Sequence, residues 1–245
     1  MLALLIIRQN MNGLANRVLF FTVIVFATWL FLDSVYWASN RSDVAMFMWS
    51  VTILIEPLVY IGSLYFLYVL IDKQDVAFRI KLKWFLLWVP LAVIAPTQYL
   101  LSGVEVSSCL VKENSLSFYS YFIEVVCIMW ITALACQRYR ASTIKEQKDK
   151  IIFLTTGVLL LCLAFTWGNL FGSFTENWQI AQYGLFGMPI FIAFLLYAIE
   201  KYKIFNIHLI GSLLFLIVMA FSITATYYRA MVLHDYDIVD SRSQQ

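Results

Sequence analysis

Three carboxylic acids stand inside long apolar stretches of this 245-residue chain, where a charged side chain is costly. They are Asp33, Glu56 and Glu124, and the amides Gln98 and Asn169 interrupt two further apolar stretches. A charge at the centre of a bilayer costs on the order of 3 kcal/mol on insertion scales, so each of these residues is a candidate for function. Two carboxylates that share a site hold fewer than two negative charges at neutral pH, which suits a proton, a cation or an amine better than an anion.

All five polar side chains fall in the same half of the predicted membrane. Counted along each helix, Asp33 comes near the outer end of its span, Glu56 near the middle and Glu124 in the outer-middle part. Gln98 and Asn169 also count to the outer half. We therefore hypothesise that these residues face a common polar cavity open to the outside, where Pro57 loosens the helix backbone beside Glu56. The alternative is that they hydrogen-bond neighbouring helices and line no cavity.

Seven apolar runs supply the elements that must position these residues. Each run is close to or above the roughly 20 residues with which a helix crosses a hydrocarbon core about 30 Å thick. In lipid the backbone must satisfy its own hydrogen bonds, so the runs predict helices. They comprise residues 18–37, 45–71, 84–101, 116–136, 151–174, 180–199 and 209–228, and the longest connections are loops over 102–117 and 137–150.

The composition agrees with a membrane protein. Hydrophobic residues make up 62% of the chain, charged residues only 13%, and the mean hydropathy is +0.80. A soluble domain has about 25% charged residues, so it could not hide this much apolar surface. The sequence predicts an all-α integral membrane protein, a seven-transmembrane helix bundle in contact with membrane lipids.

The basic residues predict the orientation of this bundle. Of the 17 lysines and arginines, 13 lie in residues 8–17, 72–83, 137–150 and 200–208, and 4 lie in the intervening segments. Short cytoplasmic loops are enriched in Lys and Arg, which places the N-terminus inside and the C-terminus outside. Residues 1–17 are then the remnant of a preceding helix followed by a basic cytoplasmic segment, and residues 229–245 form a polar outer tail.

The sequence lacks the residues that several kinds of chemistry require. The only histidines are His208 and His234, both outside the spans, so no helix-borne metal motif is present, and no glycine-rich nucleotide loop occurs. No lysine lies within a span to form a retinal Schiff base. The four cysteines make no disulfide framework, and no basic tract suggests nucleic acid. We expect neither a metal nor a cofactor.

Short motifs along residues 8–210 occur in an order that resembles a known family. They are NRVLF at residues 16–20, EPLVY at 56–60, RYR at 138–140, YGLFGMP at 183–189 and YAIEKYKIFNI at 197–207, of which the last is the most specific. Together they resemble the N-terminal seven-helix membrane region of bacterial sensor histidine kinases. The resemblance implies a multi-pass, signal-sensing module of a two-component system in the bacterial plasma membrane, with an unknown ligand.

The chain departs from this family at both ends. The first helix of the family is reduced to Met1–Ile7, and the chain stops on the outer side, after Tyr228. It contains no phosphoacceptor histidine box and no ATP-binding motif, so kinase activity is not carried over. We expect the sensor half alone, as a fragment or a stand-alone form. Its output then requires a partner, either a signalling kinase or a second copy that makes a homodimer.

Two functions of other classes compete with sensing. A small transporter or ion-conducting subunit would use Glu56 and Glu124 to relay protons or cations. A membrane enzyme is disfavoured, because the spans lack paired nucleophiles and bases.

Overall fold

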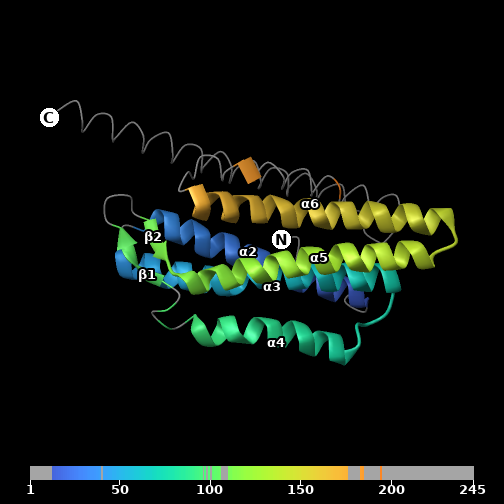
Figure 1. Cartoon of the computed structure of the whole chain (residues 1–245), viewed down its shortest axis with the longest axis horizontal. Coiled ribbons are helices and arrows are strands. Elements are labelled where there is room, and N and C mark those ends of the chain that lie inside the picture. Colours follow the sequence, from blue (N-terminus) through green and yellow to red (C-terminus); the bar gives the residue numbers. More distant parts are fainter. Residues whose placement is uncertain are drawn as a thin grey trace.

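The computed structural model describes residues 13–39, 41–95, 97, 99, 101–105, 110–175, 183, 184 and 194. Within them the chain forms five α-helices, a short 3-10 helix and one β-hairpin (Figure 1). The helices are α2 (Leu14–Ala38), α3 (Ser42–Asp72), α4 (Phe78–Ile94), α5 (Phe118–Ala141) and α6 (Lys145–Thr175), and the other elements are β1 (Leu101–Glu105), β2 (Leu110–Glu113) and η1 (Ser115–Ser117).

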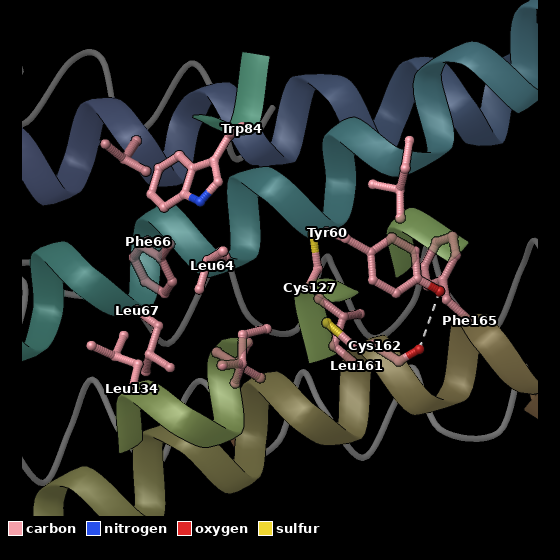
Figure 2. Close-up of a cluster of buried hydrophobic side chains, with 14 of the residues drawn as sticks. Tyr60, Leu64, Phe66, Leu67, Trp84, Cys127, Leu134, Leu161, Cys162 and Phe165 are labelled. Atoms are coloured by element: carbon pink, nitrogen blue, oxygen red, sulfur yellow. Dashed lines mark hydrogen bonds between the residues drawn. The ribbon is translucent and has the colours of Figure 1, made fainter. Parts of the chain in front are cut away.

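Helix α3 is the centre of the described bundle. It contacts α2, α4, α5 and α6, and α5 also packs along α6. Figure 1 shows α4 on the flank of the bundle, on the opposite side from α6. The residues of α3 are apolar on every side of the helix, which is typical of a helix buried among other helices. Its leucines Leu64 and Leu67 are fully buried, and Figure 2 shows Leu67 beside Leu134 of α5.

The membrane character of the chain is confirmed. Four helices are long and apolar enough to cross a bilayer, over Leu14–Tyr36, Ser42–Asp72, Ser115–Ala141 and Lys145–Gly168. They correspond to the predicted spans 18–37, 45–71, 116–136 and 151–174. The predicted spans 180–199 and 209–228 and the tail 229–245 lie outside the described residues, except residues 183, 184 and 194. Of these, Phe194 stacks on Phe153 of α6 with ring centroids 4.2 Å apart.

The predicted span 84–101 is wrong in both bounds. Helix α4 begins at Phe78 and ends at Ile94, and its 17 residues reach about 25 Å, less than a hydrocarbon core. Pro96 has no amide hydrogen to continue the helix, and the chain turns where the Thr97 amide donates to the Ile94 carbonyl at 2.9 Å. Leu101, the last residue of the predicted span, belongs to β1.

Both predicted long loops are structured. The loop 102–117 contains the hairpin, in which β1 and β2 pair antiparallel with Val104 opposite Val111, so the fold is not helical throughout. The loop 137–150 shrinks to residues 142–144, because α5 continues to Ala141 and α6 begins at Lys145. We call the end of the bundle with β1 and β2 the hairpin end.

We call the opposite end, where residues 73–77 and 142–144 lie, the basic end. There Arg138 of α5 donates to Asp72 of α3 at 2.7 Å. In the loop after α3, the Lys81 ammonium bonds Asp75 and the Tyr65 hydroxyl also donates to it, which together lower the pKa of that carboxyl group. These pairs are partly exposed to solvent, so each contributes little to the stability of the fold.

Helices α2 and α3 approach closely at Gly62. A β-carbon added there would lie 2.8 Å from the Thr22 hydroxyl oxygen and 3.2 Å from its methyl carbon. The Thr22 hydroxyl donates to the Val18 carbonyl at 2.9 Å, which fixes its rotamer. Small residues that let backbones come close are the usual basis of helix packing in membranes, where lipid and side chains are equally apolar.

Replacing Gly62 with alanine should therefore destabilise the protein by about 1–3 kcal/mol, because the new methyl group overpacks the contact. Thr22→Ala in the same chain removes both clashing atoms and should restore most of that loss. Thermal unfolding in detergent of the two single variants and the double variant measures the coupling. Additive effects of the two substitutions would contradict this contact.

Candidate functional site

The two carboxylates nearest the middle of the predicted membrane lie inside the bundle. Glu56 is at the midpoint of α3 and is 5% exposed, and Glu124 is in the second turn of α5 and is fully buried. Tyr60, one turn after Glu56 on α3, interacts electrostatically with both of them. Since residues four apart share a helix face, Glu56 and Tyr60 face α5 and α6 together. The structure thus gathers both carboxyl groups around one tyrosine.

A chain of hydrogen bonds joins three helices at this level. The Tyr60 hydroxyl of α3 lies 2.8 Å from the Thr166 hydroxyl of α6 and 3.3 Å from the Cys162 carbonyl one turn earlier. The Thr166 hydroxyl in turn donates to Oε2 of Glu124 on α5 at 3.3 Å. Figure 2 shows Tyr60 reaching across from α3 to Cys162 on α6. We call Tyr60, Thr166 and Glu124, with the Cys162 carbonyl, the polar relay.

The polar relay can be satisfied in both protonation states of Glu124. When Glu124 is ionised, Thr166 donates to the carboxylate and its oxygen accepts the hydrogen of Tyr60. When Glu124 is protonated, the carboxyl group can donate to Thr166, Thr166 to Tyr60, and Tyr60 to the Cys162 carbonyl. Each hydroxyl carries one hydrogen and can accept as well as donate, so the direction reverses without moving a heavy atom. The direction of these hydrogen bonds can therefore follow the protonation state of Glu124.

Apolar and soft side chains surround the polar relay. Cys127 and Cys162 are both buried and interact electrostatically with Glu124. On the other side, Phe165 packs edge-on against Tyr60 with centroids 6.3 Å apart, and Trp29 of α2 lies 4.7 Å from Phe165. These side chains pack around the polar relay. Hydrogen bonds in such surroundings are stronger than in water, and an unpaired polar atom is more costly.

Two of the other predicted site residues, Asp33 and Asn169, belong to described helices. Asp33 is half-buried on α2. Thr22 contacts Gly62 and Tyr36 contacts Trp49, so α2 and α3 run antiparallel and Asp33 lies closer to the hairpin end than Glu56 does. Asn169 belongs to α6, three residues after Thr166, but its side chain lies outside the described residues, as does Gln98. The structure thus brings Glu56 and Glu124 together, and a cavity common to all five residues stays a prediction.

Sequence reasoning missed Tyr60 and Thr166, because a tyrosine and a threonine in apolar runs resemble ordinary core residues. The helical spacing of the polar positions carried a signal. Tyr60 follows Glu56 by four residues, and Thr166 precedes Asn169 by three, so each pair shares a helix face. Within the described residues, no group of three or more His, Cys, Asp and Glu side chains is placed to hold a metal ion.

Thr166 offers the sharpest test of the polar relay. Thr166→Val keeps the shape of the side chain but removes the hydroxyl that joins Tyr60 to Glu124, and should cost about 1–3 kcal/mol of stability. Thr166→Ser should retain most of it, since the hydroxyl is kept.

The matched control is Thr132→Val on α5, where an exposed threonine bonds only its own helix at the Ile128 carbonyl. That change should stay within about 0.5 kcal/mol. Thermal unfolding in nanodiscs compares the three variants, and equal losses for Thr166→Val and Thr132→Val would rule out a stabilising relay.

Comparisons with models of protein families, with curated sequences and with solved structures found no match to this chain.

Proposed function

We propose that this protein is a non-catalytic transmembrane module that receives a signal at its hairpin end and passes it to its basic end. The observation that carries the proposal is the polar relay, which links a buried carboxyl group to two other helices through hydroxyls that can reverse direction. Intramembrane ionisable residues are rare, and those that occur mark ion paths, proton relays and ligand sites.

The proposed mechanism begins with a proton, a cation or an amine that changes the charge shared by Glu56 and Glu124. The hydrogen of Tyr60 then moves between Thr166 and the Cys162 carbonyl, which alters how α3 is bonded to α6. Both α3 and α5 run from this level to the basic end, where Asp72 and Arg138 join them. A shift of α3 against its neighbours would thus reach the loops at that end.

The topology that goes with this function has seven membrane segments, of which α4 is shorter than a hydrocarbon core, with the hairpin end outside and the basic end inside. It rests on the distribution of 13 of the 17 lysines and arginines and on the apolar runs beyond α6. The motif order resembling the membrane region of bacterial sensor histidine kinases supports the same assignment and the bacterial plasma membrane. The output partner is then a kinase or a second copy of this module.

A small transporter or ion-conducting subunit is the second candidate. The buried carboxylates Glu56 and Glu124 and the proline beside Glu56 favour it, because ion paths use such residues. The two candidates differ in whether ions cross the bilayer.

Reporter fusions test the topology. Fusions after residues 80, 145, 205 and 245 should report inside, inside, inside and outside, because the basic segments stay in the cytoplasm. A cytoplasmic report at residue 245 would contradict seven spans.

A fluorophore at the basic end tests the function. We would label Thr143→Cys, an exposed position between α5 and α6, in a chain whose four native cysteines are replaced with alanine. In oriented proteoliposomes, acidifying the hairpin side, or adding potassium or an alkylamine there, should change the fluorescence. The variants Glu56→Gln and Glu124→Gln should lose this response to at least one of the three probes.

The control is Asp43→Asn, which removes an exposed carboxylate that pairs with Arg41 near the hairpin end but leaves the interior intact. It should respond like the parent chain. Ion flux is recorded in the same liposomes. Flux that disappears in Glu56→Gln would show a transporter, and a parent chain silent to all three probes would refute sensing at these carboxylates.

A further inference from the structure

A cavity of about 620 Å³ opens between α3 and α4 at the hairpin end, away from the polar relay. Its α3 wall comes from one face of the helix, at positions 46, 47, 50, 51 and 54, which repeat with the spacing of a single helix side. Its α4 wall is formed by Ala92 and Ala95. On the side of α4 the lining consists of these two small side chains, which leaves space between the helices.

Two hydrogen bonds hold α4 below the cavity. The Trp88 indole donates to the Leu54 carbonyl of α3 at 3.0 Å, and the Tyr119 hydroxyl of α5 donates to the Leu87 carbonyl of α4 at 2.8 Å. Both tethers attach at the middle of α4. The last turns of α4 therefore stand off from α3, and the cavity occupies the gap.

The walls of this cavity present hydrocarbon. The two hydroxyls in its lining are engaged, since Ser50 donates to the Met46 carbonyl and Thr97 to the Ile94 carbonyl. A bound water needs two to four polar partners, and this lining offers too few free donors for a file of waters. A dry, empty space of this size would forfeit dispersion contacts along all its walls. The described lining therefore favours an apolar occupant.

The cavity is continuous with the surface that faces lipid. Phe47 lies on its rim and is 63% exposed, and Val93, next to Ala92, is 66% exposed. Helix α3 is among the helices that can cross the bilayer, so acyl chains are the neighbouring phase. The volume is also within the range of about 300–1,000 Å³ that small-molecule pockets occupy.

We infer that this cavity is a binding site for one acyl chain of a membrane phospholipid, inserted between α3 and α4 near the hairpin end. The inference does not depend on the proposed signalling function. Its occupant touches Leu54, whose carbonyl accepts the Trp88 bond two residues before Glu56. A bound chain therefore packs against the part of α3 that carries the carboxylate.

Photolabelling in nanodiscs tests the site. The protein is placed in phosphatidylcholine that contains a phospholipid with a diazirine on its acyl chain, and the labelled peptides are mapped by mass spectrometry. Residues 46–54 and 92–101 should be labelled several-fold more than the lipid-exposed face of α5 around Met129, which is 66% exposed. Native mass spectrometry of the parent chain should also retain one phospholipid.

Ala92→Phe places a ring in the cavity and should reduce its labelling at least fivefold without changing the labelling around Met129. The matched control is Ala133→Phe, an exposed alanine of α5, which should leave the labelling at α3 and α4 unchanged. The comparison within the parent chain needs no variant, so it stands even if Ala92→Phe does not fold. Labelling of residues 46–54 that equals or falls below that around Met129 overturns the site, and is the result expected if a second copy or another segment of this chain fills the space.

Discussion

A carboxyl group in a lipid-embedded interior must have hydrogen-bond partners, and this requirement fixes how the central helices meet. Glu124 is fully buried, and the described donor to its carboxylate is a hydroxyl on another helix, which is itself bonded to a third. These bonds form only when α3, α5 and α6 keep one rotation and one level relative to each other. In a bilayer, lipid tails are as apolar as leucine, so burial of apolar surface alone would not select that register. Polar bonds and close contacts such as Thr22 with Gly62 select it instead.

Prolines in α3 and α4 leave backbone carbonyls without a helical partner, and aromatic side chains donate hydrogen bonds in these turns. Pro57 in α3 and Pro90 in α4 each lack an amide hydrogen, so each opens the helical turn before it. In both turns the carbonyl three residues before the proline accepts a bond from a neighbouring helix, from Trp88 at Leu54 and from Tyr119 at Leu87. Neighbouring side chains commonly compensate prolines in membrane helices in this way. The same bonds attach α4, which has only Trp84 and Leu91 buried along its length.

Hydropathy predicted the helices whose whole length is apolar, and failed where local chemistry ends an apolar run. Residues 84–101 are apolar enough to span, yet Pro96 stops the helix and the hairpin takes Leu101. At charged helix ends the predicted helices were too short, because α5 and α6 continue through basic residues that lie outside the apolar runs. Of the site, the sequence located Glu56 and Glu124 by their cost in lipid. It did not locate Tyr60 and Thr166, because a hydroxyl in an apolar run becomes a site only when another helix brings it a partner.

The polar relay and the α4 tether act on the same stretch of α3 from different sides. At about 100° per residue, Glu56 points roughly 200° around the helix from Leu54, so one faces α5 and α6 while the other lines the gap to α4. Pro57 removes one backbone hydrogen bond in this stretch, so the helix backbone is less constrained there than in a regular turn. A change in the bonds of Tyr60 and a change in the position of Trp88 must both be absorbed there. The two features are therefore coupled through the backbone of α3, although no described side chain connects them directly.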